Sequence, residues 1–268
     1  MIKLFGIPYD NNSSYLKGPA LAPQRIRLME KEGSANAFSE GGTEISVGKN
    51  YLDMGDMVFE SMDSVHAFKT IKNNTVMALA DNHPMIFFGG DHSVSYPLID
   101  AFSEKFENLH ILHFDAHADL YDNFDNNPYS HASPFARIME QGRVKSLTQV
   151  GIRTLNTHQK QQAEKFNVHI IEMKNFSQDF LQTLQGPLYI SVDLDVLDPA
   201  FAPGVSHHEP GGMQTRQLLD IIQQIKVPIV GADIVEYNPV RDLHNMTAMV
   251  AYKIFKELAS AMLKSMWK

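Results

Sequence analysis

The stretch LHILHFDAHAD, residues 109–119, decides the fold that we expect for this chain. Its apolar first half is typical of a buried strand in a parallel sheet, which is hydrophobic on both faces. Asp115, His117 and Asp119 then follow at every second position. Because side chains two residues apart share one face of an extended backbone, two carboxylates and an imidazole are expected to converge. Carboxylates this close repel each other and lose hydration, and a bound divalent cation would remove that cost.

Two other segments have the same form, an apolar strand followed by side chains that bind metals. PLYISVDLDVLD, residues 187–198, brings Asp193 and Asp195 to the end of a strand, again two positions apart. MIFFGGDHS, residues 85–93, ends in two glycines followed by an acid and His92. The candidate metal ligands are therefore four carboxylates and two imidazoles, namely His92, Asp115, His117, Asp119, Asp193 and Asp195.

The types of ligand narrow the choice of metal. Six ligands exceed what one zinc ion requires, and zinc prefers four-coordination with more nitrogen or sulfur. Mg²⁺ usually keeps more water, whereas a carboxylate-rich set with two imidazoles suits two ions such as Mn²⁺. Two such ions roughly 3.5–4 Å apart would lower the pKa of a water between them and support hydrolysis without an amino-acid nucleophile.

Composition limits the classes of protein and of partner. The chain of 268 residues is 44% hydrophobic, enough for a large core, and its formal charge of −8 argues against nucleic acid or an anionic membrane as a partner. It has no cysteine, which excludes disulfide scaffolds, thiolate zinc sites and cysteine nucleophiles. We expect a cytoplasmic protein, because the sequence has neither a secretory signal nor an apolar run near the ~18 residues of a membrane span.

Strands alternate with helices from residue 62 onward, which predicts an α/β fold with a parallel sheet and helices on both faces. No low-complexity linker and no repeat divides the chain, so one domain over residues 1–268 is expected. Ligands bind beyond the carboxyl ends of the strands in such sheets. Long loops at 118–133 and 198–212 follow two of the acidic strand ends and are expected to wall a substrate pocket. Short strand-like pieces are expected around Ile45 and Val58, and a helix over 178–184.

Longer motifs resemble a known family. GGDHS at 89–93, DAHAD at 115–119 and SVDLDVLDP at 191–199 are similar to the three metal motifs of the ureohydrolases, the arginase and agmatinase superfamily. The resemblance continues through YSHASPFARIM at 129–139, DPAFAPGVSHHEPGG at 198–212 and GADIVEYNPVRD at 231–242, which look most like plant-type arginases. It implies a three-layer α/β/α fold around a mostly parallel sheet, two Mn²⁺ ions per subunit, a homo-oligomer (trimer or hexamer), and hydrolysis of a guanidino group to urea and an amine.

The resemblance also implies a role for each site residue. One ion would take His92, Asp115, Asp119 and Asp193, and the other would take Asp115, His117, Asp193 and Asp195, so that two carboxylates bridge. Asp119 would also orient the attacking hydroxide. His131, within SHASPF, matches the family's acid/base histidine, and Glu236, within DIVEYNP, matches the glutamate that pairs with the substrate guanidinium.

The far end of the substrate is less well defined by sequence. The SGNxHG-like loop with which mammalian-type arginases read the α-carboxylate is replaced here by NNPYSHASPF, so the candidates for that contact are Asn126, Asn127, Asn156 and His207. The SHHEPGG segment favours L-arginine, giving urea and L-ornithine. Agmatine or another guanidino compound is the alternative substrate. A single-zinc deacetylase and an inactive metal-stabilised scaffold are two further classes, and retention of all six ligands plus Glu236 argues against both.

Overall fold

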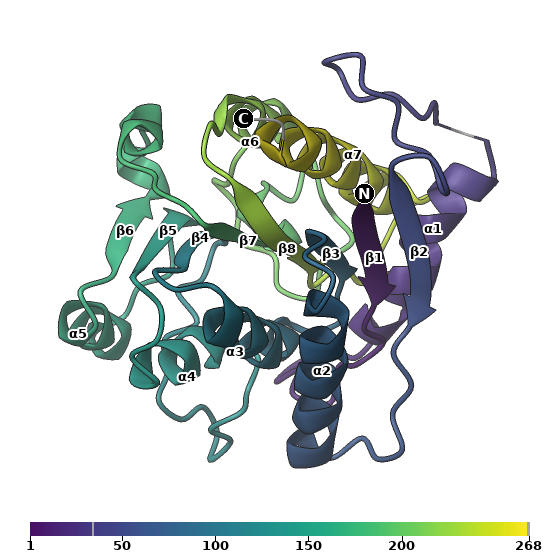
Figure 1. Cartoon of the computed structure of the whole chain (residues 1–268). Coiled ribbons are helices and arrows are strands. Elements are labelled where there is room, and N and C mark those ends of the chain that lie inside the picture. The colour runs from purple at the N-terminus through teal and green to yellow at the C-terminus, as the bar shows by residue number, and fades with distance from the viewer. Residues whose placement is uncertain (34, 267–268) are drawn as a thin grey trace.

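The computed structural model describes residues 1–33 and 35–266. One eight-stranded sheet forms its centre, in the order β2-β1-β3-β8-β7-β4-β5-β6, and every neighbouring pair of strands is parallel (Figure 1). The strands are β1 (Ile2–Gly6), β2 (Tyr51–Asp56), β3 (Met85–Phe88), β4 (His110–Phe114), β5 (Ser146–Ile152), β6 (His169–Glu172), β7 (Leu188–Asp193) and β8 (Ile229–Val235). The predicted α/β fold with a parallel sheet is confirmed.

Helices cover both faces of the sheet, so the fold has three layers (Figure 1). One face carries α1 (Ala22–Lys31), α6 (Thr215–Gln224) and α7 (Met246–Met266). The other face carries α2 (Ser64–Leu79), α3 (Ser95–Lys105), α4 (Pro134–Glu140) and α5 (Thr157–Lys165). Short 3-10 helices are η1 (Pro19–Leu21), η2 (His92–Val94), η3 (Met173–Asn175), η4 (Gln178–Gln182) and η5 (Leu194–Val196).

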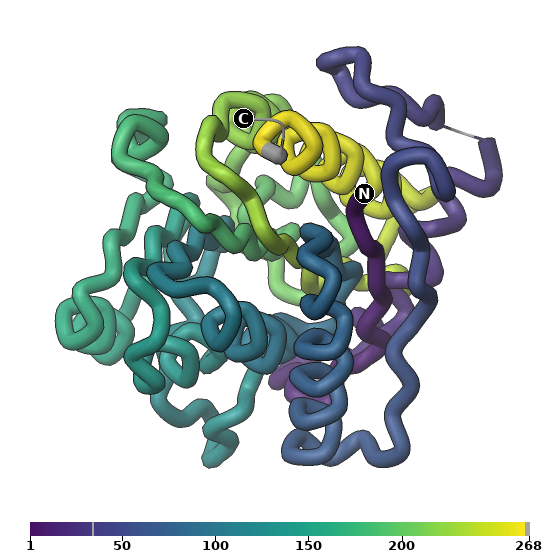
Figure 2. The backbone as a smooth tube through the Cα atoms, in the orientation of Figure 1, coloured from purple at the N-terminus to yellow at the C-terminus, as the bar shows by residue number. Residues whose placement is uncertain are grey.

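The pattern of apolar residues explains why the central strands and the helix α7 form where they do. The β3 sequence MIFF is buried throughout, as expected of a strand covered on both faces. In α7, Ile254, Leu258 and Met262 recur four residues apart and are fully buried, so this helix presents a broad apolar stripe to the sheet. Figure 2 shows α7 in yellow passing close to the purple β1, and the two elements are in contact. None of the helices in the described ranges has the length and hydropathy needed to cross a bilayer.

Two local expectations were wrong. The strand in the 44–59 region is β2, whereas Ile45 and Val58 lie outside any strand. Because β2 is an edge strand with one partner and its residues after Tyr51 are exposed, its sequence YLDMGD lacks the apolar run that marks a central strand. The helix expected at 178–184 is the shorter 3-10 helix η4.

The order of the strands places the acidic motifs together. β3, β8, β7 and β4 are consecutive in the sheet and parallel, so their carboxyl ends lie at one edge. The close packing of backbone at this edge requires glycine at position 90, because a Cβ built there would lie 1.7 Å from the carbonyl oxygen of Tyr9. Gly90 also accepts a hydrogen bond from the backbone N–H of Glu236 at 2.9 Å, which joins the ends of β3 and β8.

Replacing Gly90 with alanine should therefore destabilise the fold by about 3 kcal/mol or more, because the methyl group would collide with backbone that cannot rotate away. Urea unfolding followed by circular dichroism measures the change. Gly41→Ala is the matched control, since the Cβ there meets first only the amino end of the flexible Lys264 side chain. Equal stability of the two variants would contradict the close approach at Gly90.

Candidate metal centre

The loop after β4 supplies half of the candidate ligands, but not in the way that the sequence pattern predicts. β4 ends at Phe114, and residues 115–119 form a bent loop instead of a continued strand. Asp119 has a positive φ of 50°, which reverses the direction of the chain. The expectation of a shared strand face was therefore wrong, although the side chains do converge.

The first cluster forms around His92, which lies in η2 just after β3. The Nδ1 atom of His92 is 3.1 Å from Oδ2 of Asp115, 3.0 Å from Oδ2 of Asp119 and 3.2 Å from Oδ2 of Asp193. All of these residues are buried. Despite these short distances, His92 Nδ1 has no hydrogen-bond partner of acceptable geometry.

The second cluster forms around His117. Its Nδ1 atom lies 2.9 Å from Oδ2 of Asp195 and 3.4 Å from Oδ1 of Asp115. The two oxygens of Asp115 thus face different imidazoles, one in each cluster. Asp193, the last residue of β7, turns Oδ2 toward His92, while its Oδ1 accepts a hydrogen bond from the backbone N–H of Asp195 at 2.8 Å. All six predicted ligand residues lie in these two clusters.

The far side of the His92 ring fixes its tautomer. Ser191 Oγ donates to Asp233 Oδ1 at 2.6 Å and lies 3.0 Å from His92 Nε2. Because the serine proton is directed to Asp233, Ser191 accepts from His92 Nε2–H. In the neutral ring this leaves the Nδ1 lone pair pointing at the carboxylates, as in a metal-binding histidine.

The residues present fit a divalent cation. Metal–ligand bonds of about 2.0–2.2 Å place neighbouring ligand atoms of one ion about 3 Å apart. The separations of 3.0–3.2 Å around His92 Nδ1 match this spacing, and the unpartnered nitrogen is the atom that a metal would engage. Oxygen-rich sets with imidazole suit hard or borderline ions.

Electrostatics also require positive charge at the two clusters. Burial, and then the charges of Asp195 and Asp115, raise the pKa of Asp193 well above its ordinary value. Burial and Asp115 likewise raise the pKa of Asp195 to about 6. Burial alone would lower the pKa of His117, but Asp195 and Asp115 raise it well above its ordinary value. The carboxylates therefore bind either protons or a cation.

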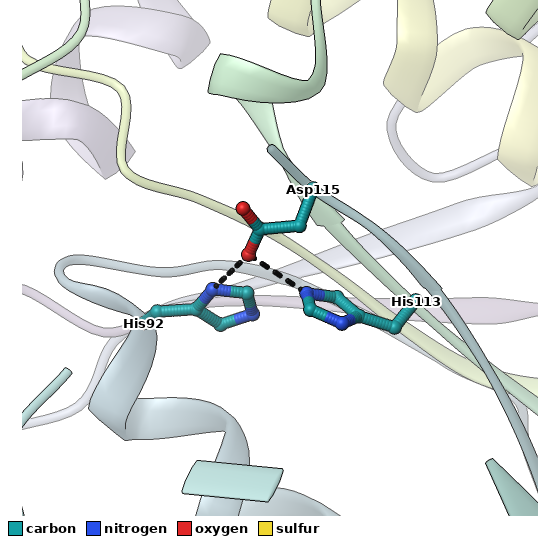
Figure 3. Close-up of side chains that lie close together, drawn as sticks. All are labelled: His92, His113 and Asp115. Atoms are coloured by element: carbon teal, nitrogen blue, oxygen red, sulfur yellow. Dashed lines mark hydrogen bonds and ion pairs between the residues drawn. The ribbon is translucent and has the colours of Figure 1, made fainter. Parts of the chain in front are cut away.

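A third histidine lies behind Asp115. His113, in β4, approaches Oδ2 of Asp115 with Nε2 at 2.8 Å, so this oxygen lies between His92 and His113 (Figure 3). His92, His113 and Asp115 form one of the groups whose atoms are close enough to hold an ion. Burial lowers the pKa of His113, which favours the neutral ring. Sequence reasoning missed this residue, because a histidine inside an apolar strand gives no signal of its own.

Glu236 and His131 form a buried pair beside the clusters. Oε1 of Glu236 lies 2.8 Å from Nδ1 of His131 and accepts the backbone N–H of His92 at 2.9 Å. Burial alone would lower the pKa of His131, but Glu236 outweighs it and raises that pKa to about 9. Burial raises the pKa of Glu236, yet His131 brings it below its ordinary value. The pair is therefore an imidazolium and a carboxylate near neutral pH.

Two site residues are held in a strained backbone conformation. Asp119 and Glu236 have φ values of 50° and 62°, in the left-handed region that non-glycine residues rarely adopt. The surrounding fold imposes it: Asp119 accepts from the backbone N–H of Phe135, and Glu236 donates to Gly90. Strain of this kind concentrates at functional sites.

The clusters open into a cavity of about 230 Å³. Its lining includes four of the predicted ligands (His117, Asp119, Asp193 and Asp195), the pair His131 and Glu236, and Ser14, Tyr121, Phe124, Ala132, Thr154, Gln159, His207 and Glu209. No lysine or arginine is among these lining residues of the described chain. Ser14, from the loop after β1, lies with Oγ 2.8 Å from Nε2 of His131.

The four candidates for the substrate's far end differ in position. His207 lines the cavity, and its contact with the substrate stays a prediction. Asn156 lies outside the lining, where its side chain caps α5 by accepting from the N–H of Gln159 at 2.9 Å and donates to the Tyr121 hydroxyl. Asn126, in a turn with φ of 61°, and Asn127, whose side-chain amide donates to Oδ1 of Asn12 at 3.2 Å, are also absent from the lining. Ser14 and Gln159 were missed because they come from distant loops without a motif, whereas Glu209 lies in the recognised HHEPGG segment.

Comparisons with known proteins agree with this geometry. The family model described as "Arginase family" matches residues 1–260. "Arginase 1, mitochondrial" of Arabidopsis thaliana is 44% identical over 97% of this chain and 81% of that protein. The "N(1)-aminopropylagmatine ureohydrolase" of Thermus thermophilus is 34% identical over 90% of this chain and 84% of its own length.

A solved structure extends the agreement to three dimensions. The arginase of Medicago truncatula superimposes with a TM-score of 0.92 at 41% identity, and the match covers 97% of this chain and 87% of that one. The fold, the two clusters of acids and imidazoles and the sequence matches all lead to the same result. The chain belongs to the arginase family of ureohydrolases, which are metal-dependent hydrolases.

Proposed function

We propose that this protein hydrolyses the guanidino group of L-arginine, giving urea and L-ornithine. The observation that carries the proposal is the position of Glu236, a buried carboxylate that lines the same cavity as the acidic clusters. A carboxylate binds a planar guanidinium through strong, charge-assisted hydrogen bonds. Identity of 42–45% to several proteins named as plant arginases supports arginine as the substrate.

We propose two Mn²⁺ ions as the metals. His92, Asp115, Asp119 and Asp193 would hold one ion, and Asp115, His117, Asp193 and Asp195 would hold the other. When bound, such a pair of ions lowers the pKa of water toward neutrality, which is the chemistry that hydrolysis of an unreactive guanidinium needs. Two bridging carboxylates would keep the ions close together.

The chain's own groups then bind the substrate and move protons. Among the described residues, Oε1 of Glu236 already accepts two hydrogen bonds and Oε2 accepts none, so Oε2 is available to the guanidinium. Asp119 takes a proton from the attacking water. Asp119 passes this proton to the leaving amine nitrogen, and His131, an imidazolium in this structure, donates the second proton that the nitrogen needs. His131 regains a proton from the hydroxyl group that becomes the urea oxygen, and its Nε2 lies 2.8 Å from Oγ of the exposed Ser14. Urea and the protonated amine then depart.

Agmatine is the second candidate substrate, and one observation favours it. The cavity lining has Glu209, whose Oε1 lies 3.7 Å from His117 Nε2, and the buried Gln159, whose Oε1 has no hydrogen-bond partner. Two acceptors without a lysine or arginine suit an ammonium group better than a carboxylate. Both arginine and agmatine carry a distal ammonium group, whereas guanidinobutyrate does not.

We also propose that residues 1–268 form one domain, supported by the single sheet that runs from β1 to β8. A homo-oligomer, trimer or hexamer, and a cytoplasmic location complete the proposal. Several plant relatives are named as mitochondrial or chloroplastic proteins, which is the alternative location. Analytical ultracentrifugation and cell fractionation test these two points.

Manganese should raise the melting temperature of the chelator-treated protein, because a ligand that binds only the folded state stabilises it by about 2.7 kcal/mol at 100 times its dissociation constant. Elemental analysis should find two Mn per chain. Asp115→Asn should lose most of both effects, since Asp115 faces both clusters, whereas Asp179→Asn, an exposed acid outside the site, should retain them. Metal-independent melting of the parent protein would reject the binuclear centre.

Glu236→Gln should lower kcat/KM for arginine at least about 100-fold, because a neutral amide cannot pair with the guanidinium as a carboxylate does. His131→Asn should lower kcat by about 10²–10⁴, the usual contribution of a general acid. Both variants should keep two Mn per chain, since neither residue is a proposed ligand. His169→Asn is the control, because His169 is an exposed residue of the edge strand β6. Full activity of either site variant would remove that residue from the mechanism.

Urea release from arginine, agmatine and guanidinobutyrate, measured with Mn²⁺ on one sample, separates the substrates. We expect turnover of arginine and none of guanidinobutyrate. Glu209→Gln should raise KM for the accepted substrate about 2–5-fold with kcat unchanged, as a partly exposed ion pair contributes little. Glu164→Gln, an exposed acid on α5, is the matched control. Turnover of agmatine alone would reject arginine as the substrate.

A further inference from the structure

A buried chain of polar side chains behind Asp115 is not used by the mechanism above. Gln149 of β5 donates from Nε2 to the carbonyl oxygen of Ala118 at 2.6 Å and to Nδ1 of His113 at 3.0 Å. His113 Nε2 lies 2.8 Å from Oδ2 of Asp115. His113, Gln149 and Asp115 are fully buried, so each polar contact replaces one with water.

The contacts fix the amide orientation of Gln149. Its nitrogen end faces the Ala118 carbonyl at 2.6 Å, and the opposite orientation would place two acceptor oxygens against each other. The oxygen end has no hydrogen-bond partner, so no contact at that end opposes this assignment. Gln149 therefore presents a donor, and not an acceptor, to His113.

A donor from Gln149 determines the tautomer of His113. Since Nδ1 accepts from Gln149, it carries no proton, and the proton of the neutral ring lies on Nε2. This N–H points at Oδ2 of Asp115, the oxygen that also faces His92 Nδ1 at 3.1 Å (Figure 3). A protonated Nε2 has no lone pair to offer a metal, although His113 lies close enough to the cluster to be counted with it.

Packing holds the ring in this position. The Phe135 ring of α4 lies 3.9 Å from that of His113, centroid to centroid, at 30°, and the His92 ring lies 5.0 Å away at 66°. β4 pairs with β5 in a register that places His113 directly opposite Gln149. The donor is therefore preorganised by the sheet and not by the loops around the cavity.

We propose that His113 is a positioning residue that holds the bridging carboxylate of Asp115 through its Nε2–H, and that Gln149 selects the tautomer needed for this. His113 is then not a third imidazole ligand. Gln149 acts twice, because its bond to Ala118 also fixes the loop between the ligands His117 and Asp119. The inference rests on the proposed metal role of Asp115, and partners of this kind typically change metal affinity 10–100-fold.

The test measures Mn²⁺ affinity by equilibrium dialysis and elemental analysis, without substrate. His113→Phe keeps a ring against Phe135 but has no donor, whereas His113→Gln places an amide N–H near the position of Nε2. We expect His113→Phe to weaken manganese binding 10–100-fold and His113→Gln to restore most of it. Gln149→Met, which removes the donor at similar volume, should weaken binding in the same direction.

Several outcomes would overturn the proposal. Wild-type affinity in His113→Phe would show that the donor does not matter, and loss of one ion in both His113 variants would make His113 a ligand. Melting in the presence of chelator checks that each variant folds.

If His113→Phe does not fold, ¹⁵N NMR of the parent protein decides, since a proton on Nδ1 of His113 contradicts the proposal and one on Nε2 supports it. Absence of urea release from a parent protein with two Mn bound would reject the proposed function and leave this inference standing.

Discussion

Mutual repulsion among four buried carboxylates is the constraint on which the rest of the structure depends. Asp115, Asp119, Asp193 and Asp195 approach one another at the carboxyl ends of β4 and β7, where little water can screen them. Buried charges of like sign are tolerated only when other groups compensate them. Here the compensation comes from imidazoles, backbone N–H groups and, in the proposed function, cations. The strained conformations of Asp119 and Glu236 belong to the same arrangement, since both residues line the cavity beside the clusters.

Much of this could be predicted because strand patterns and strand order act together. Apolar runs mark β3, β4, β7 and β8, and each is followed by acidic or imidazole side chains. Parallel pairing then brings those ends to one edge, whatever the local loop conformation. This is why the six predicted ligand residues converge even though the extended-strand argument for residues 115–119 was wrong. The two-residue spacing of side chains in this segment did not predict its backbone conformation, whereas the expected parallel sheet correctly predicted that the side chains would meet.

The features that could not be predicted from the sequence are an edge strand of the sheet and several residues around the candidate site. β2 has one partner strand and an exposed sequence, so tertiary pairing and not periodicity makes it a strand. Asn156 is a polar residue of the kind that binds substrates when it lies in a loop. In this structure it caps α5 instead, because the helix begins one residue later. His113 and Ser14 can be recognised only in the folded structure, where distant segments meet. The register of β4 with β5 places His113 beside Gln149, and the loop after β1 places Ser14 against His131.

The strand order has a consequence for biosynthesis. β7 and β8 are made late in the chain, yet they lie in the middle of the sheet, between β3 and β4. Until they emerge from the ribosome, the nascent chain can form only two separate three-stranded pieces, β2-β1-β3 and β4-β5-β6, each with an unpaired inner edge. The most apolar edges are therefore exposed during synthesis, when pairing with another nascent chain competes with completion of the sheet. His92 follows β3 and Asp115 follows β4, so these two predicted ligands remain in separate pieces until β7 and β8 join the sheet, and the proposed metal site is complete only at the final step of folding.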